Sequence, residues 1–245
     1  MSEADWLATD VDEQPVLVCS TAGGTGVSVL SALLADRRAR SGLGSMSWWV
    51  DCAPGDSDLP GRMGVAVDVD GEPVSSSVGA TIWRPSPSRA TPFSPISPES
   101  ALKEATSRGA VPVLDTGSSA RSVVPLLADN PAIVPVLVLG ARPDLLNRAR
   151  PVLTEWAAAG VLARTVLILN GQVPLQVQQH LSAQVTNALA GWVRVVITIH
   201  YDQHLGAGGA LSPDRRDQLS TQFMQMLGRL SAATVSPALS QAKAV

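Results

Sequence analysis

The feature that most constrains the fold is an alternation of solid apolar runs with longer amphipathic stretches. The runs are "PVLVCS", "SWWVDC", "VPVLDT", "AIVPVLVLG", "RTVLILNG" and "VRVVITIHYD". Strands that are buried on both faces lose the period of two and consist mostly of Val, Ile and Leu, which is typical of parallel sheets covered by helices. The alternation therefore predicts an α/β fold with a doubly wound, mostly parallel sheet flanked by helices.

The stretches between these runs predict the covering helices. They are expected over residues 27–40, 118–128, 144–159, 175–189 and 213–232. Ser212 before Pro213 is typical of a helix start, because the hydroxyl caps a free amide and proline at the first helical position has no amide hydrogen to lose.

Residues 70–98 interrupt the alternation with many prolines and serines. Within them, "GATIWR" predicts a short edge strand, and the remainder predicts a surface excursion longer than a routine connection. At this chain length we expect one domain over residues 14–231, preceded by a flexible N-terminus over 1–13 and followed by a flexible tail over 232–245.

Composition and charge exclude several classes of protein. Hydrophobic residues make up 45% of the chain, charged residues 16%, and the net charge is -3, so neither disorder nor a nucleic-acid signature is indicated. The acidic start does not resemble a signal peptide, and the longest apolar run is too short for a transmembrane segment. The two cysteines, Cys19 and Cys52, end buried runs and are expected to be reduced core residues. Cytoplasmic localisation follows as the expectation.

The stretch "CSTAGGTGVS", residues 19–28, lies between the first apolar run and the first helix. Backbone amides at such a helix start can surround an anion. The phosphate-loop pattern G-x-x-x-x-G-K-[ST] fits at Gly26 and Ser28, but Thr21 replaces its first glycine and Val27 its lysine. A dinucleotide fingerprint fits worse, since Val29 stands at its third glycine. On the loop alone, a glycine-rich tight turn without a ligand remains the alternative.

With this loop the chain resembles the ParA/MinD-type P-loop ATPases of the SIMIBI class, whose deviant Walker A loop reads K-G-G-x-G-K-[ST]. That pattern falls on "AGGTGVS", where Ala22 and Val27 replace the two lysines. After the second run, "VDCAP" is similar to the family's I-D-x-D-P, with Asp51 and Pro54 matched. Ala53 replaces the second aspartate, which in the family orients the attacking water.

The resemblance continues through the chain, in order and spacing, from about residue 14 to 231. "VPVLDTGSS" is similar to the Walker B strand and puts Asp115 at the magnesium-associated carboxylate, while "TVLILNG" puts Asn170 where the family reads adenine. "ITIHYDQHLGAGGALSPDRR" is similar to the last strand and base-contacting loop, with His200 in place of a proline. The resemblance implies nucleotide contacts from Gly23, Gly24, Thr25, Gly26, Val27, Ser28, Asp51, Asp115, Asn170, Tyr201 and Asp202. Ser28 and Asp115 would hold Mg²⁺ if a nucleotide binds.

The departures from the family pattern bear on the chemistry. Phosphoryl transfer depends on positioning and on neutralising charge, and Ala22, Val27 and Ala53 supply neither. No catalytic residue is assigned, efficient ATP hydrolysis is not expected, and ATP with Mg²⁺ is expected to bind weakly if it binds.

Three functions remain open from the sequence. The first is a pseudo-ATPase scaffold or adaptor, similar to degenerate ParA-like proteins of secretion, Tad pilus, conjugation or partitioning machines. The second is an active Mg-ATPase that draws its missing cations from Arg37, Arg38 or a partner subunit. The third is an α/β domain that binds another small anionic ligand at the same strand ends.

The resemblance implies a homodimer or other protein partners, including a membrane-associated secretion or pilus complex that recruits the protein. Trp48 and Trp49 are expected in core layers. Trp83, with Arg84 and Arg89, is expected to be an exposed anchor, so we hypothesise that residues 70–98 contact a partner subunit.

One further cluster follows the last apolar run. His200, Asp202 and His204 share one side of the chain there, and a loop-capping role is favoured over a metal site, because no further Cys or His lies nearby.

Overall fold

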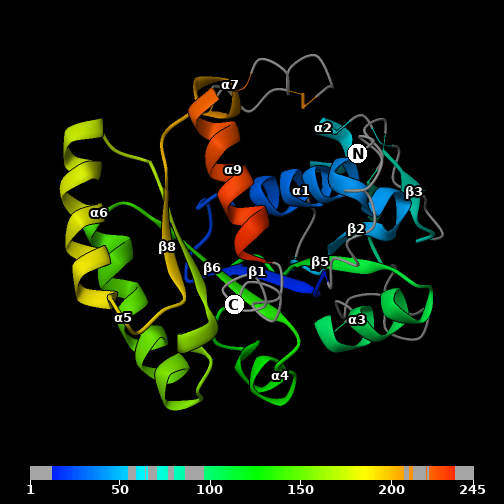
Figure 1. Ribbon diagram of the computed structural model, residues 1–245, viewed down its shortest axis with the longest axis horizontal. Coiled ribbons are helices and arrows are strands. Elements are labelled where there is room, and N and C mark those ends of the chain that lie inside the picture. Colours follow the sequence, from blue (N-terminus) through cyan, green and yellow to red (C-terminus); the bar gives the residue numbers. More distant parts are fainter. Residues whose placement is uncertain are drawn as a thin grey trace, which may run out of the picture.

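The computed structural model describes residues 13–54, 59–63, 65, 71–76, 80–85, 97–206, 210–211, 219 and 221–234. These residues form one eight-stranded sheet in the order β3-β4-β2-β5-β1-β6-β7-β8, in which only the β3–β4 pair is antiparallel (Figure 1). The strands are β1 (Val16–Ser20), β2 (Ser47–Asp51), β3 (Val74–Ser75), β4 (Thr81–Trp83), β5 (Val111–Asp115), β6 (Val134–Gly140), β7 (Val166–Asn170) and β8 (Val195–Ile199). Each of the six apolar runs contains a strand, so the predicted doubly wound sheet is confirmed.

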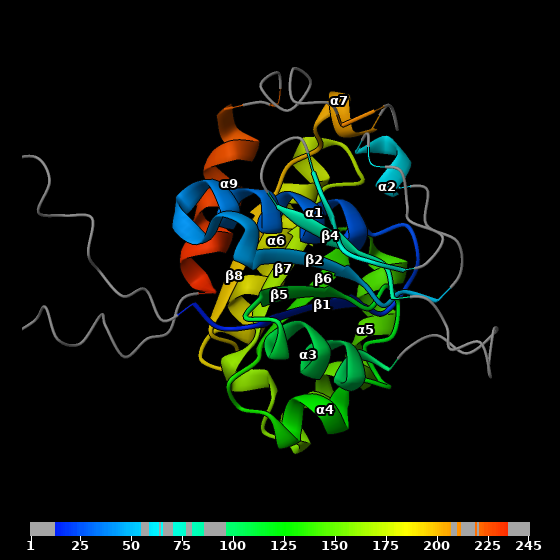
Figure 2. The ribbon, with the colours of Figure 1, turned by 90° about the vertical axis from the view of Figure 1, so that its right-hand side faces the viewer.

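Helices cover both faces of the sheet. They are α1 (Val27–Arg38), α2 (Leu59–Arg62), α3 (Pro98–Ser107), α4 (Val124–Asp129), α5 (Pro143–Ala158), α6 (Leu175–Leu189), α7 (Gln203–Gly206) and α9 (Thr221–Ala233), with short helical turns over 39–43, 44–46 and 162–164. In Figure 2, α1 and α9 lie on one side of the sheet and α3 and α4 on the other.

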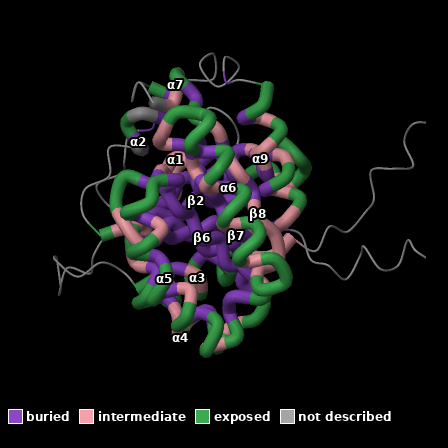
Figure 3. Tube along the Cα trace, turned by 90° about the vertical axis from the view of Figure 1, so that its left-hand side faces the viewer, coloured by how far each residue is buried: buried purple, intermediate pink, exposed green. Residues whose placement is uncertain are grey.

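The alternation of side chains along β1 explains the two layers. Val16 and Val18 pack in one apolar cluster with α1 and α9, whereas Leu17 and Cys19 pack in a second cluster with α3, α4 and α5. The interior strands are therefore buried on both faces, as the purple centre of Figure 3 shows. Cys19 and Cys52 are buried and unpaired, as expected for core thiols, and burial raises the pKa of both.

Three helices differ from the prediction: α3, α4 and α9, which begins at Thr221 after a bend at Leu219, whereas one helix was expected over 213–232. Instead of spanning 118–128, α4 begins only at Val124, because Pro125 is tolerated in the first turn of a helix but not in its interior. Helix α3 was not predicted, although Ser97 caps it by accepting a hydrogen bond from the Ser100 amide (3.2 Å) and Pro98 follows the cap. The same Ser-Pro signal at residues 212–213 lies outside the described residues, and α9 runs to Ala233, slightly past the predicted domain end.

The expectation for Trp83 was wrong. Its side chain is buried, with 6% of its surface exposed, its Nε1 donates a hydrogen bond to the Gly71 carbonyl (2.7 Å), and its ring meets Trp48 edge to face at 5.7 Å. Strand β4 is also not an edge strand, since it pairs with β2 on one side and β3 on the other. The residues Thr81–Trp83, although they lie inside the Pro-rich stretch, therefore form a paired strand of the sheet. Trp48 and Trp49 are core residues, as predicted, and Arg89 lies outside the described residues.

Candidate functional site

The glycine loop lies where the carboxyl ends of β1, β2 and β5 meet. Gly24 and Gly26 have φ of 72° and 87°, in the left-handed region that side chains disfavour, and a Cβ on Gly26 would lie 2.8 Å from Asn170 Nδ2. At the start of the loop, the Ala22 amide donates to Ser20 Oγ (3.1 Å). The loop conformation is therefore specific to glycine at these positions.

Two amide side chains at the carboxyl end of β7 and just after it donate hydrogen bonds to this loop. Asn170 Nδ2 donates to the Thr25 carbonyl (2.8 Å) and Gln172 Nε2 donates to the Gly24 carbonyl (2.6 Å). The sequence placed Asn170 at the site but missed Gln172, because nothing local signals a contact that spans 148 residues. In this structure Asn170 shapes the loop with its amide nitrogen.

The loop leaves its own amides available. Within the described residues, the backbone amides from Gly23 to Ser28 donate no hydrogen bond, and the start of α1 at Gly26 has no side-chain cap. Such amides at a helix N-terminus are the groups that bind phosphates and other anions. They face a cavity of about 330 Å³ lined by the loop together with Ala53, Pro54, Gly117 and Ser118.

The lining of this cavity carries the departures that the sequence indicated. Ala22, Val27 and Ala53 all line it, and no lysine or arginine is found among its lining residues in the part of the chain described here. The cavity therefore combines hydrogen-bond donors for an anion with an absence of the cations that would complete its binding.

Two buried carboxyl groups lie beside the loop, on neighbouring strands. Asp51 and Asp115 are directly opposite each other in the register of β2 and β5. In each, Oδ1 accepts a hydrogen bond from the amide two residues further on: from Ala53 at 3.1 Å and from Gly117 at 2.9 Å. In each, Oδ2 is buried without a hydrogen-bond partner. The pair thus presents two unsatisfied oxygens.

Burial dominates the titration of this pair. It raises the pKa of Asp51 to about 6, with a further increase from the charge of Asp115, while the Ala53 amide and Arg84 act in the opposite direction. Burial also raises the pKa of Asp115, although its interaction with the Ser28 hydroxyl favours the charged form. Two close carboxyl groups in a dry site ionise with difficulty unless a cation joins them.

These residues fit Mg²⁺ bound together with a phosphate. Mg²⁺ takes one or two carboxylates and completes its octahedron with phosphate and water oxygens, and the chain offers Asp115, Asp51 and the Ser28 hydroxyl. The described residues contain no group of three His, Cys, Asp or Glu that could hold a metal by itself. When bound, the ion would neutralise phosphate charge next to the loop.

The predicted loop-capping role is confirmed for Asp202 of the cluster after β8. Asp202 Oδ1 accepts hydrogen bonds from the amides of His204 (2.9 Å) and Leu205 (3.2 Å), at the start of α7. With Asn170 and Tyr201, Asp202 lines a second cavity of about 340 Å³ that also reaches Gly24 and Gly26. The structure therefore gathers all the predicted contact residues at one end of the sheet.

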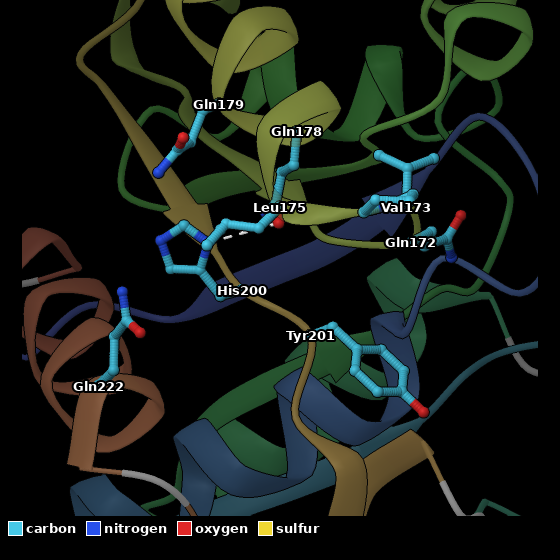
Figure 4. Close-up of a pocket in the computed structure, with 9 residues that line it drawn as sticks. Gln172, Val173, Leu175, Gln178, Gln179, His200, Tyr201 and Gln222 are labelled. Atoms are coloured by element: carbon cyan, nitrogen blue, oxygen red, sulfur yellow. Dashed lines mark hydrogen bonds between the residues drawn. The ribbon is translucent and has the colours of Figure 1, made fainter.

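A third cavity has a volume of about 590 Å³ (Figure 4). It adjoins the second cavity, because Gln172, His200 and Tyr201 line both. Buried Gln178 donates through Nε2 to the Ile199 carbonyl (2.8 Å), so its Oε1 is the acceptor for His200 Nδ1 at 3.3 Å. Figure 4 shows the other ring nitrogen, Nε2, on the side of the ring away from Gln178. The sequence missed Gln178.

The two arginines of this chain that the sequence offered as replacement cations, Arg37 and Arg38, lie away from the loop. Arg38 is buried at the far end of α1, about 16 Å from the loop by helical rise, and pairs with Glu13 at 2.6 Å. Arg37 packs against Gly228 of α9. Among the described residues, Arg84 is a cation next to the site, and its Nε lies 3.8 Å from Asp51 Oδ2.

The sheet order and the glycine loop at its carboxyl edge define a P-loop NTPase fold of the ParA/MinD type. A ParA family ATPase from Chlorobium tepidum superposes with a TM-score of 0.62 at 17% identity, covering 90% of this chain and 99% of that one. MinD in the MinC:MinD complex of Aquifex aeolicus gives 0.64 at 16% identity, covering 89% and 96%. A putative plasmid partition protein from Borrelia burgdorferi, bound to AMPPNP, gives 0.58 at 13%, covering 90% and 98%.

Comparison with known proteins finds this likeness in the structure and not in the sequence. No protein-family model matches the chain, and no curated protein matches it. Among the described residues, no helix is long and apolar enough to cross a membrane.

Proposed function

We propose that this chain is a ParA/MinD-like pseudo-ATPase, which binds a nucleotide weakly and acts as a non-catalytic scaffold or adaptor. The observation that carries the proposal is the cavity at the glycine loop. It keeps free amides, and the buried Asp51–Asp115 pair lies next to it, while Ala22, Val27 and Ala53 line it at the positions where the resemblance places cations and a water-orienting carboxylate.

The magnitudes favour weak binding without turnover. A charge-assisted contact to phosphate contributes about 1.5 to 3 kcal/mol, so two missing lysines reduce binding by about 3 to 6 kcal/mol, or roughly 10²- to 10⁴-fold in affinity. The amides and a carboxylate-held Mg²⁺ offset part of this loss. Without a lysine on the transferring phosphoryl group and without a carboxylate at position 53 to orient water, hydrolysis loses two of the groups that accelerate phosphoryl transfer.

The partners belong to the same proposal. The MinC:MinD structure pairs a protein of this fold with a partner protein, and we propose that this chain likewise acts through a homodimer and through protein contacts. The machine served would be one of secretion, pilus assembly, conjugation or partitioning, with a cytoplasmic protein recruited to the membrane through its partners.

The test is steady-state ATP turnover together with calorimetric titration of Mg-ATP. We expect turnover at background and weak, Mg²⁺-dependent binding that Ser28→Ala and Asp115→Ala each reduce. Turnover above background that both variants abolish would show an active ATPase completed by a partner subunit's cation. Binding of inorganic phosphate with no binding of ATP would support the third function, a site for another small anion.

A further inference from the structure

Arg84 occupies a defined place at the carboxyl edge of the sheet. It follows the last residue of β4, and β4 runs parallel to β2 with Val50 opposite Trp83, so the residue after Trp83 lies alongside Asp51. Trp83 anchors this position through its hydrogen bond to Gly71 and its packing on Trp48. Arg84 is therefore presented by a buried strand and not by a loose loop.

The atom that Arg84 faces is one of the two unsatisfied oxygens. Its Nε lies 3.8 Å from Asp51 Oδ2, which accepts no hydrogen bond, and Asp51 is directly opposite Asp115. Buried carboxylates need a counter-charge, because removing ions from water costs several kcal/mol each. The neighbouring cavity offers no lysine or arginine from its described lining residues.

We propose that the Arg84 guanidinium is the resident counter-cation of the Asp51–Asp115 pair and competes with a divalent cation for it. The side chain is about a quarter exposed, so it has room to leave the pair when a divalent ion enters. The free protein then does not depend on Mg²⁺ for stability, and Arg84 weakens Mg²⁺ binding. This proposal deepens the proposed function and rests on it in one respect only: the anion that would accompany the metal is the phosphate of the nucleotide.

The experiment uses the full chain without nucleotide, with MgCl₂ or MnCl₂ as the probe and NaCl of matched ionic strength as the control. Thermal unfolding reports stability, and Mn²⁺ binding is followed by water-proton relaxation. The variants are Arg84→Gln, Asp51→Asn and the double variant. Arg121→Gln serves as the matched control, because Arg121 forms an exposed ion pair with Glu155 at 3.2 Å.

We expect wild type and Arg121→Gln to be insensitive to the metal. Arg84→Gln should unfold at a lower temperature than wild type in EDTA and should recover its stability with Mg²⁺. It should also bind Mn²⁺ at least about tenfold more tightly than wild type, because a tenfold change in affinity corresponds to the free energy of about one charge-assisted contact. The double variant should regain stability without metal and lose the metal response, because Asp51 no longer carries a charge.

Two results would overturn the inference: equal metal responses of wild type and Arg84→Gln, or a metal response that survives in the double variant. If Arg84→Gln does not fold, the double variant decides: it should fold in EDTA, because Asp51→Asn removes the charge that Arg84 balances. A double variant that also fails to fold contradicts the pairing. Failure here leaves ATP turnover and ATP binding untouched, so the two proposals fail separately.

Discussion

Val27 has two environments at once. Its side chain is buried in the layer between the sheet and α1, yet it lines the cavity at the glycine loop, at the position where the resemblance places a phosphate-binding lysine. A longer side chain there can extend into the cavity without entering the core. This makes the position suitable for restoring the missing charge.

Val27→Lys should raise the affinity for Mg-ATP by about tenfold or more, since one charge-assisted contact contributes at least roughly 1.4 kcal/mol. Calorimetry measures the change. Val27→Met is the matched control, because it adds length without charge and should leave the affinity unchanged. Equal affinities for wild type and Val27→Lys, with the fold intact, would mean that the loop is not shaped for phosphate.

Asp51 predicts a pH dependence of stability. Its pKa is raised from 3.8 to about 6 in the folded chain, so between these values the folded protein binds more protons than the unfolded one. The free energy of unfolding therefore falls as pH rises from about 4 to 6. Asp51→Asn lacks this loss and should gain on wild type by up to about 3 kcal/mol above pH 6, at 1.36 kcal/mol per pKa unit.

Urea unfolding of both proteins between pH 4 and 7 measures this difference. Asp129→Asn is the matched control, because it makes the same substitution at an exposed residue at the end of α4. An advantage of Asp51→Asn that grows toward pH 4 would mean that the folded pKa lies below its usual value.

At the scale of elements, β4 shows that part of the Pro-rich stretch belongs to the sheet. Its three residues pair with β2, and Trp83 packs in the apolar cluster on the α3 face of the sheet. The hypothesis that residues 70–98 contact a partner now rests on the part that lies outside the described residues. Deleting residues 75–95 would remove a strand, so a partner lost on such a deletion would not locate an interface.

Trp83→Ala should destabilise the protein by about 3 to 5 kcal/mol, because it empties a buried volume and leaves the Gly71 carbonyl without its partner. Trp192→Ala is the matched control, since 60% of Trp192 is exposed and truncation there should change stability by about 0.5 kcal/mol or less. Urea unfolding compares the two. Similar small losses for both tryptophans would contradict the placement of β4 in the sheet.

At the scale of the whole molecule, we propose that the homodimer forms through the face that carries the glycine loop. Apolar Ala22 and Val27 remove two positive charges from that face, so pairing there needs no phosphate to neutralise them. We expect a homodimer whose sedimentation is the same with and without Mg-ATP. Ala22→Arg, which restores a charge at the face, should weaken the dimer at least tenfold in analytical ultracentrifugation, and a dimer that forms only with nucleotide would contradict the proposal.

The sequence by itself determined the layers of this protein and the place of the candidate site. Solid Val, Ile and Leu runs that alternate with amphipathic stretches predict a parallel sheet covered on both faces, and the glycine loop lies between the first run and the first predicted helix. Ala22, Val27 and Ala53 could be identified as departures from the family pattern, since they lie in two short motifs that can be compared directly. Both signals are local along the chain.

Only the tertiary structure decided which distant side chains meet. Strand order and register determine three features that no local pattern encodes: the hydrogen bond from Gln172 to the glycine loop, the position of Arg84 beside Asp51, and the burial of Trp83. Arg37 and Arg38 are near the loop in sequence, but the rise of α1 carries them away from it. The chemistry of the site depends on contacts across the sheet, whereas the fold follows from hydrophobic periodicity along the chain.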